Sequence, residues 1–303
     1  MHSMKLWRQG KVKDVYDVDG HVLEFVFTDK ISVFDKVIPS VVPHKGDTLC
    51  RTSAFWFQML RGMGIKSHFT ELIPPNRMRV KKVAVISDYS KITPKTTNYL
   101  IPLEVICRHY VAGSLFDRIN EGRVTPKELG FPAKKKVKYG DELPHPMIEV
   151  TTKLEKVDRP LTKTEAMKIA ALSKSEYNNL VEIVLKIDEE IADEADQRDL
   201  IHVDGKKEFA FDEDRELMIV DTFGTADEDR WWDWIEVSKG KFNELSKEMV
   251  RQHYRKTGYY DKLNKARTAG KREPAIPALP GNKIKEVTKL YIDLFERITG
   301  ESY

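Results

Sequence analysis

The chain has 303 residues, with 51 lysine and arginine residues against 48 aspartate and glutamate residues, and a formal net charge of +3. This length suits one large domain or two smaller ones with a substantial core. The near balance of charge gives no bulk electrostatic reason to expect a nucleic-acid partner. No apolar run reaches the length that spans a membrane, so a membrane partner is not expected either.

Cysteine usage and the first residues predict a reducing, cytoplasmic compartment. Cys50 and Cys107 stand far apart in apolar surroundings, which favours buried free thiols over a disulfide. Residues 1–11 contain no apolar stretch of the length of a signal peptide. The histidines are scattered without a pair at ligand spacing, which argues against a zinc site.

The first third of the chain reads mainly as strands. Two apolar runs, 15–18 and 22–27, flank Asp19-Gly20. Such a pair between apolar runs predicts a hairpin, in which we expect both central residues to have positive φ. The other elements predicted here are a helix over about 53–62 and strands near 78–80 and 84–86.

The rest of the chain mixes strands and helices. Residues 87–98 are polar and read as a long loop or an exposed hairpin near a domain hinge, and 102–110 reads as a strand. Thr162 and Ser173 each precede a glutamate by three residues, which predicts two capping boxes, the second opening a long helix. A further helix closes the chain before Gly300. This order predicts an α+β protein with two lobes.

An acidic hairpin is expected within 200–221. Phe209 and Phe211 alternate with other residues before a polar turn at 212–216. A turn centred between residues 214 and 215 places Glu208 opposite Asp221, with Lys206 one pleat away. Like charges across a ladder are unfavourable, and Mg²⁺ held by carboxylates and substrate phosphates would compensate them. Alternatively, both acids are exposed at the surface, or Lys206 neutralises them.

A glycine turn with two lysines lies near the start of the chain. Gly10 allows backbone N–H groups to approach a ligand closely. Lys11 and Lys13 alternate and so share one face of a strand. Two ammonium groups beside a glycine turn suit a polyphosphate. The alternative is an exposed strand edge that its lysines protect from pairing.

Two further polar clusters have both a functional and a structural interpretation. Arg108 ends a buried-looking run shortly before Gly113 and Ser114, so a guanidinium and a hydroxyl are available for a phosphate. Alternatively, Arg108 forms a structural ion pair with Glu104 or another acid. Acids at 227–229 precede three tryptophans, which we expect to be core anchors, with the acids capping a helix.

Several segments of the chain occur in one order: GKVKDVY at 10–16, TDKISVFD at 28–35, PLEVICRHYVAGS at 102–114, TTK at 151–153, the D-x-K-x-E-F pattern that opens 204–221, and Asp227 with Arg230. Taken together, and in this order, these segments resemble the SAICAR synthetase family. The departures from the family pattern are Lys30, Ala210, Thr222, Ala226 and Asp229, the last replacing a small residue.

The resemblance implies a fold and a reaction. A β-rich lobe over 1–83, similar to the small lobe of a kinase, would cover ATP above a larger α/β lobe over 84–303. The family's reaction joins carboxyaminoimidazole ribotide (CAIR) to L-aspartate and gives SAICAR, ADP and phosphate in purine biosynthesis. ATP phosphorylates the carboxylate of CAIR, and the aspartate amine attacks the acyl phosphate.

The resemblance also implies the residues that contact ATP and metal. Glu208 and Asp221 would bind Mg²⁺, and the residues with a direct catalytic part would be Lys13, Lys206 and Arg230. The whole ATP site would consist of Gly10, Lys11, Val12, Lys13, Lys81, Lys82, Glu208 and Asp221.

For the ribotide and aspartate, the resemblance implies a second set of residues. This set comprises Ser32, Asp35, Arg108, Ser114, Lys206, Asp227 and Arg230. A small-molecule kinase with the same ATP and Mg²⁺ site is the alternative function, and it needs no aspartate. The substrates are the expected partners, and the sequence leaves open whether the protein is a monomer or a homo-oligomer.

Overall fold

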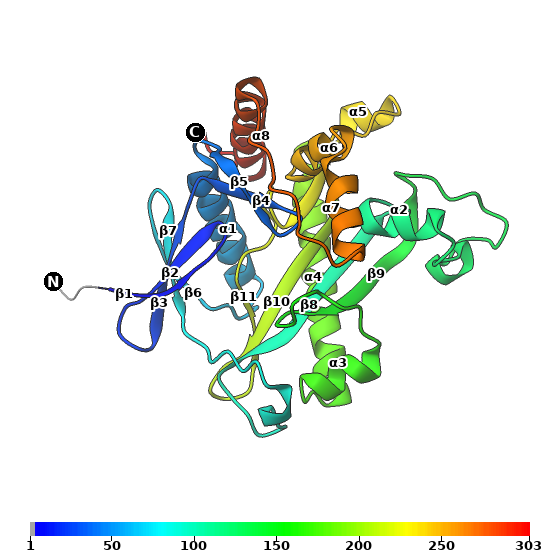
Figure 1. Ribbon diagram of the computed structural model, residues 1–303. Coiled ribbons are helices and arrows are strands. Elements are labelled where there is room, and N and C mark those ends of the chain that lie inside the picture. Colours follow the sequence, from blue (N-terminus) through cyan, green and yellow to red (C-terminus); the bar gives the residue numbers. More distant parts are fainter. Residues whose placement is uncertain (1–3) are drawn as a thin grey trace.

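The computed structural model describes residues 4–303 and contains two antiparallel sheets joined by helices (Figure 1). The α+β prediction is therefore confirmed. The first sheet lies on one side of the molecule. Its strands, in spatial order, are β1 (Lys5–Gln9), β2 (Lys13–Asp17), β3 (Val22–Phe27), β7 (Arg77–Lys81) and β6 (Phe69–Ile73).

The second sheet forms the centre of the molecule and is built around two twelve-residue strands. A two-stranded hairpin of β4 (Lys30–Val33) and β5 (Lys36–Val41) stands apart from both sheets. The strands of the second sheet are β11 (Leu217–Val220), β10 (Leu200–Phe211), β8 (Tyr99–Tyr110) and β9 (Glu142–Thr152), with β12 (Asp229–Asp233) also paired to β10.

Two long helices cover the sheets, and a third closes the chain. Helix α1 (Lys45–Gly62) packs against the first sheet and lies beside α8 (Gly281–Thr299), while α4 (Lys174–Asp196) packs on β10 and β8. Both predicted capping boxes are present. The shorter helices are α2 (Gly113–Asn120), α3 (Lys163–Ile169), α5 (Trp234–Ser238), α6 (Glu248–Lys256), α7 (Tyr259–Thr268) and the 3₁₀ helices η1 (Tyr89–Lys91) and η2 (Pro126–Leu129).

Helix α1 begins eight residues before the predicted start because its first turn packs closely on the first sheet. Lys45 and Gly46 are buried, and Asp29 accepts a hydrogen bond from the Gly46 N–H at 2.9 Å. A Cβ at Gly46 would lie 2.7 Å from the carbonyl oxygen of Phe27. Glycine therefore lets the helix start against the backbone of β3, which the apolar spacing alone does not reveal.

Other local predictions were partly wrong. Residues 84–86 form only one bridge, between Ala84 and Tyr99, instead of a strand. Asp229 opens a strand rather than capping a helix, and Asp233 caps α5. In the β2–β3 turn, Gly20 has φ of 89°, whereas Asp19 keeps negative φ and its carboxylate accepts hydrogen bonds from the N–H groups of His21 and Val22.

The β10–β11 hairpin is displaced by one residue from the predicted register. Glu208 pairs with Val220 and Phe209 with Ile219, so Asp221 lies beyond the ladder instead of opposite Glu208. The cause is a loop of odd length. The Arg215 N–H donates to the Asp212 carbonyl, and Arg215 itself has φ of 59°, as in three-residue hairpin loops that end in a left-handed residue.

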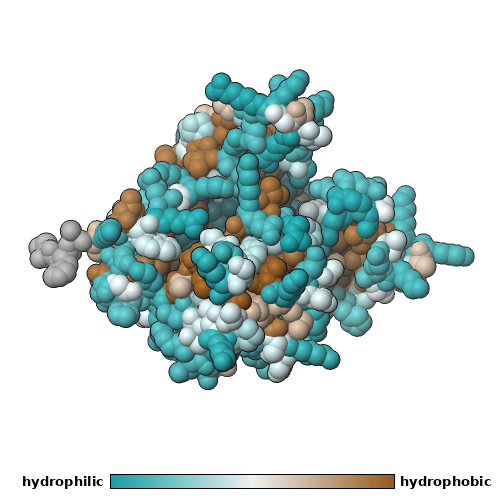
Figure 2. Space-filling view, turned by 60° about the horizontal axis from the view of Figure 1, so that its bottom comes forward, coloured by the Kyte–Doolittle hydropathy of each residue, from teal (hydrophilic) through white to brown (hydrophobic). Residues whose placement is uncertain are grey.

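The polar character of the surface and the burial of the two thiols agree with what the composition predicts. Figure 2 shows a face on which polar side chains predominate and apolar ones form small, separate patches, as on most globular proteins. Cys50 and Cys107 are free and buried, as predicted. No helix within residues 4–303 combines the length and hydropathy needed to cross a membrane.

Candidate active site

A first cavity of about 280 Å³ lies between the first sheet and the β10–β11 hairpin. Its walls are mostly apolar, whereas one end carries lysine and carboxylate groups. Lys82 is not part of the lining, because its Nζ turns away to Asp17 at 2.5 Å. The remaining predicted ATP-site residues all line this cavity: Gly10, Lys11, Val12, Lys13, Lys81, Glu208 and Asp221.

The glycine turn has the tight geometry that its sequence predicts. The Gly10 N–H donates to the Lys13 carbonyl oxygen at 2.9 Å, and a Cβ at Gly10 would lie 2.4 Å from that oxygen. Lys11 points outward, and its Nζ lies 2.6 Å from a carboxylate oxygen of Asp35. Lys13 points inward and forms an ion pair with Asp221. The two lysines therefore have different surroundings.

Glu208 and Asp221 are both compensated by lysines. Glu208 forms ion pairs with Lys153 and, at 3.0 Å, with Lys206. Burial opposes ionisation of both carboxyl groups. The nearby ammonium groups outweigh it, Lys153 foremost for Glu208 and Lys13 foremost for Asp221, and hold the pKa of each below its ordinary value. Both groups are therefore ionised, and Lys206 supplies only part of the positive charge.

Asp221 is fixed through its backbone as well. It has φ of 62°, and its carbonyl oxygen lies 3.3 Å from Nε2 of His68. Burial lowers the pKa of His68 to about 4, so the ring is neutral at pH 7 and donates through Nε2. This contact joins β11 to the chain just before β6.

A second cavity of about 190 Å³ adjoins the ends of β8, β10 and β12. Its lining contains five of the residues predicted for the ribotide and aspartate, together with three acids and one arginine outside that predicted set, Asp204, Glu228, Asp229 and Arg251. The predicted residues in its lining are Arg108, Ser114, Lys206, Asp227 and Arg230.

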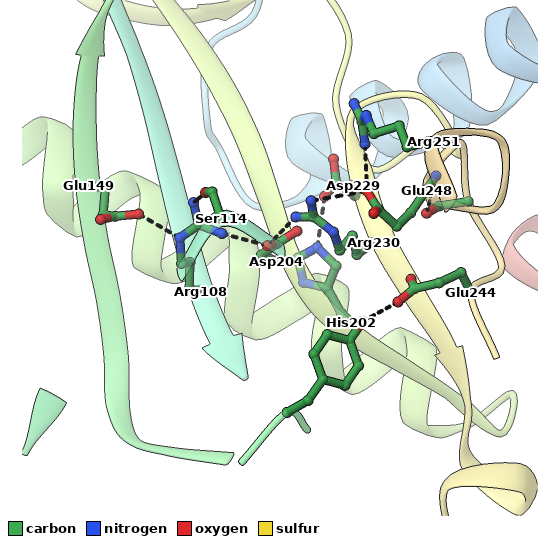
Figure 3. A network of polar contacts seen from close by, with 12 residues as sticks. Arg108, Ser114, Glu149, His202, Asp204, Asp229, Arg230, Glu244, Glu248 and Arg251 are labelled. Carbon is green, nitrogen blue, oxygen red and sulfur yellow. Dashed lines mark hydrogen bonds and ion pairs between the residues drawn. The ribbon is translucent and has the colours of Figure 1, made fainter. Parts of the chain in front are cut away.

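Asp204 holds two guanidinium groups at this cavity (Figure 3). Its Oδ2 accepts from Arg108 at 2.8 Å and from Arg230 at 2.6 Å. Arg108 also donates to Glu149 at 2.5 Å and to Ser114 at 3.2 Å. Both interpretations of Arg108 are thus compatible with the geometry, since it is ion-paired and still lines the cavity.

Glycine again makes room for a charged group. Gly113 has φ of 50°, and a Cβ there would lie 2.4 Å from a guanidinium nitrogen of Arg230. The Arg230 side chain also lies 3.3 Å from a carboxylate oxygen of Glu248. Arg230 is therefore fixed in position by acids on β10 and α6 and by the absence of a side chain at the start of α2.

Asp227 is buried among groups from distant parts of the chain. Tyr291 donates to its Oδ1 at 2.5 Å, and the ammonium groups of Lys45 and Lys247 lie 3.0 and 3.3 Å from its Oδ2. Burial opposes the charge, but Lys247 and Lys45 hold the pKa of Asp227 well below its ordinary value. Asp227 is therefore a fixed negative charge at the wall of the second cavity.

Lys206 connects the two cavities. It lines the second cavity, and its Nζ lies 3.0 Å from Glu208, which lines the first. Glu104 and Glu228 also lie within 3.2 Å of this ammonium group. Three carboxylates outweigh the effect of burial, so the pKa of Lys206 stays well above its ordinary value and the group remains charged.

Ser32 and Asp35 line neither cavity. Ser32 lies on β4 and is partly buried, and Asp35 is exposed and contacts Lys11. Sequence reasoning gave no role to Asp204 or Lys153, although both belong to segments that carry the family resemblance. Lys45 and His68 had no such signal, because their contacts are with residues more than 150 positions away.

Comparisons with known proteins identify the family of the chain. The sequence profile of SAICAR synthetase matches residues 6–266. The phosphoribosylaminoimidazole-succinocarboxamide synthases of Thermoplasma volcanium and Thermoplasma acidophilum are 54% and 52% identical to this chain, over 99% of its length and 100% of theirs.

Solved structures share the fold. A SAICAR synthetase in complex with ADP is 25% identical and has a TM-score of 0.70, over 98% of each chain. The Saccharomyces cerevisiae SAICAR synthase complexed with SAICAR is 24% identical and has a TM-score of 0.73, over 99% of this chain and 96% of that one. The chain therefore belongs to the SAICAR synthetase family.

Proposed function

We propose that this chain condenses CAIR with L-aspartate, with ATP bound in the first cavity and the ribotide in the second. The observation that carries this assignment is the position of Lys206, a charged side chain that lines the second cavity and contacts Glu208 in the wall of the first. Transfer of a phosphoryl group requires the nucleotide and its acceptor to meet in a fixed geometry. A cation that lines one cavity and contacts a carboxylate of the other supports such a meeting point.

The first cavity suits a nucleotide. Its apolar walls, which include the side chains of Val15, Val80 and Leu100, can pack against the faces of a base. Its charged end carries Lys13 and Lys153, which can neutralise phosphate oxygens. We place adenine against the apolar walls near Lys81 and the phosphates beside Gly10 and the lysines. We also propose that the boundary between the two lobes lies between residues 83 and 84.

Glu208 and Asp221 suit Mg²⁺. Both are ionised carboxylates at the phosphate end of the first cavity, and Mg²⁺ is bound in proteins through one or two carboxylates together with substrate phosphates. When bound, the ion neutralises charge on the phosphates. Lys13 and Lys153, which pair with these carboxylates in the structure, would then be free to contact phosphate oxygens.

The second cavity suits an anionic ribotide. The guanidinium groups of Arg108 and Arg230 and the hydroxyl of Ser114 are suitable donors for a phosphate or a carboxylate. Asp227 offers an acceptor for ribose hydroxyls. For L-aspartate, we propose two partly exposed cations, Lys11 beside Asp35 at the first cavity and Arg251 at the second.

The chemistry follows from what each bond requires. A carboxylate is a poor electrophile, so its oxygen first takes the γ-phosphoryl group of ATP, and ADP leaves. The neutral aspartate amine then attacks the carbonyl carbon, phosphate leaves with the bonding electron pair, and the amine nitrogen loses a proton. The chain's part is to position the reactants and neutralise their charges, with Lys206 beside the transferring group.

The test is an assay in which each substrate is omitted in turn. Amide product is expected only when ATP, Mg²⁺, CAIR and L-aspartate are all present. Equal release of ADP without aspartate would favour the kinase alternative. We also propose a reducing, cytoplasmic location, which is supported by the two buried free thiols.

A further inference from the structure

A buried charge cluster of four residues lies on the face of β10 that packs against α4: Lys207 and His202 on β10, Asp188 on α4 and Asp229 on β12, which also borders the second cavity. All four side chains have zero exposure. Lys206 and Glu208 face the cavities, whereas Lys207 between them faces α4. A bulge at residue 203 puts His202 on the same face as Lys207. The cluster lies directly behind the strand that carries the proposed catalytic groups.

The contacts within the cluster link α4 to β12 through β10. The Lys207 ammonium lies 2.7 Å from Oδ2 of Asp188 and 3.8 Å from Oδ2 of Asp229. Nε2 of His202 lies 2.7 Å from the same Asp229 oxygen (Figure 3), and its Nδ1 lies 3.5 Å from Oδ1 of Asp188. Each carboxylate therefore faces both basic side chains.

Gly205 shows how closely Asp229 approaches β10. A Cβ at Gly205 would lie 2.0 Å from Oδ2 of Asp229 and 2.8 Å from Nζ of Lys207. Only glycine leaves room for the carboxylate and the ammonium to meet across the strand. The Lys207 ammonium thereby lies between the carboxyl groups of Asp188 and Asp229, inside the protein.

Asp229 has a second contact, which reaches the active-site loop 221–228. Its Oδ1 accepts a hydrogen bond from the Gly224 N–H at 2.9 Å. On the other side of the same residue, Nε1 of Trp56 donates to the Gly224 carbonyl at 2.8 Å. The loop is thus held at its middle residue, Gly224. Asp221 at its start lines the first cavity, and Asp227 near its end lines the second.

We infer that Asp229, held by His202 and Lys207, is a positioning residue that fixes loop 221–228 so that Asp221 and Asp227 face their two substrates. This inference rests on the proposed roles of those two aspartates. Asp229 itself stands where the family pattern has a small residue. Asp229 is therefore this chain's own means of holding a loop whose chemistry it shares with its family.

A metal ion is the competing explanation for these buried polar groups. Ligand atoms of Cys107, His109 and Asp188 all lie within 4.8 Å of one another. However, the Lys207 ammonium already contacts Asp188 at 2.7 Å, and a metal ion beside it would meet electrostatic repulsion. The structure therefore favours an ionic cluster closed by lysine, and metal analysis of the purified protein tests this choice.

The main experiment compares Asp229→Asn with Asp233→Asn at the other end of β12. Asp233 caps α5 and pairs with Arg297, away from both cavities. Turnover, the KM for CAIR, the Mg²⁺ concentration for half-maximal rate and the melting temperature are measured for both variants. Asp229→Asn should lower turnover about 10- to 100-fold and raise the Mg²⁺ requirement. Asp233→Asn should change the melting temperature alone.

Two variants of His202 test the same inference if Asp229→Asn does not fold. His202→Gln retains a donor toward Asp229, whereas His202→Ala does not, so the glutamine variant should keep more turnover and the lower Mg²⁺ requirement. The inference is overturned if Asp229→Asn, or both His202 variants, melt earlier but keep the parent's turnover and Mg²⁺ dependence. Stoichiometric zinc that is lost on Cys107→Ser would also overturn it.

The proposed function can fail separately. If Glu208→Gln and Asp221→Asn both retain full activity, the assignment of the first cavity is wrong. If these two variants lose activity while Asp229→Asn retains it, only the positioning inference is wrong.

Discussion

Lys13 and Asp221 form an ion pair across the first cavity, between β2 of the first sheet and the residue that follows β11 of the second. Both were predicted to act on ATP, one on its phosphates and the other on Mg²⁺. In the structure each is the other's partner. Binding of Mg-ATP would therefore replace this ion pair with two new ones, and several predictions depend on this exchange.

Asp221→Asn should destabilise the protein without ligand. The hairpin pattern alone suggested the reverse, since removing one of two opposed acids relieves repulsion. However, Asp221 lies beyond the ladder and faces Lys13, so the amide variant leaves an ammonium group without its partner. We expect a loss of about 1–2 kcal/mol, together with a smaller gain in melting temperature on adding Mg-ATP.

The pH dependence of this contribution has a defined sign. Lys13 holds the pKa of Asp221 below its ordinary value. The stabilisation is therefore present above the ordinary pKa of an aspartate and is lost as pH falls through the lowered value. Melts at pH 7 and at a pH below the ordinary pKa of an aspartate, about 3.9, should show the parent and Asp221→Asn approaching each other as pH falls. A constant difference would contradict the ion pair as its cause.

Lys11→Ala and Lys13→Ala should differ. The side chain of Lys11 is about half exposed, whereas that of Lys13 is mostly buried and lies 4.3 Å from the ring centroid of Phe25. Both variants should weaken ATP binding in calorimetry, but only Lys13→Ala should also lower the melting temperature without nucleotide. Unchanged nucleotide affinity in both variants would remove the glycine turn from the site.

Asp204→Asn should impair the second cavity and not the first. Its carboxylate holds the guanidinium groups of Arg108 and Arg230, and the loss of one charge leaves two buried cations short of a partner. We expect the KM for CAIR to rise at least about 10-fold and stability to fall by about 3 kcal/mol. The KM for ATP should stay within about twofold of the parent value.

Asp212→Asn provides the matched control for this prediction. Asp212 is also a buried acid of the β10 segment, and it accepts backbone hydrogen bonds in the hairpin turn and pairs with Lys66. Its variant should lose stability without a selective rise in the KM for CAIR. If Asp212→Asn and Asp204→Asn change that KM equally, the assignment of the second cavity is wrong.

Local patterns predicted most of the elements and some cavity-lining residues, such as Lys13 and Arg108, because these patterns depend on near neighbours in the sequence, and the family resemblance supplied the rest of the predicted site. The capping boxes and the glycine turn at Gly10 are of this kind. The hairpin register was wrong because it depends on loop length, and one left-handed residue, Arg215, shifted Glu208 away from Asp221. A period-2 pattern does not reveal that shift.

The groups that compensate the buried charges were not predictable in the same way. Asp227 forms ion pairs with Lys45 of α1 and with Lys247, which lies just before α6, and it accepts a hydrogen bond from Tyr291 of α8. Nothing in the neighbourhood of any of these residues indicates the others, since the contacts arise from packing of distant segments. Ser32 was assigned from family resemblance alone, and the structure leaves it outside both cavities.

Glu244 should make the protein less stable as pH rises. Burial raises the pKa of its carboxyl group to about 7, and the side chain faces Tyr139, Arg230 and Glu248. Below the ordinary pKa near 4.5, Glu244 is neutral in both the folded and the unfolded protein. Between about pH 4.5 and pH 7 the unfolded chain ionises first, so the free energy of unfolding falls as pH rises.

Glu244→Gln tests this prediction because glutamine copies the shape and acceptor of the neutral acid. At pH 5 the variant and the parent should have nearly equal stability. At pH 8 the variant should be more stable by up to about 3 kcal/mol, the free energy that corresponds to the shift in pKa. Glu236→Gln is the control, since hydrogen bonding to Lys239 lowers the pKa of Glu236 and its variant should gain nothing at pH 8. Equal stability of parent and Glu244→Gln at both pH values would show that Glu244 ionises in the folded protein as easily as in water, with Arg230 as the nearby positive charge that permits it.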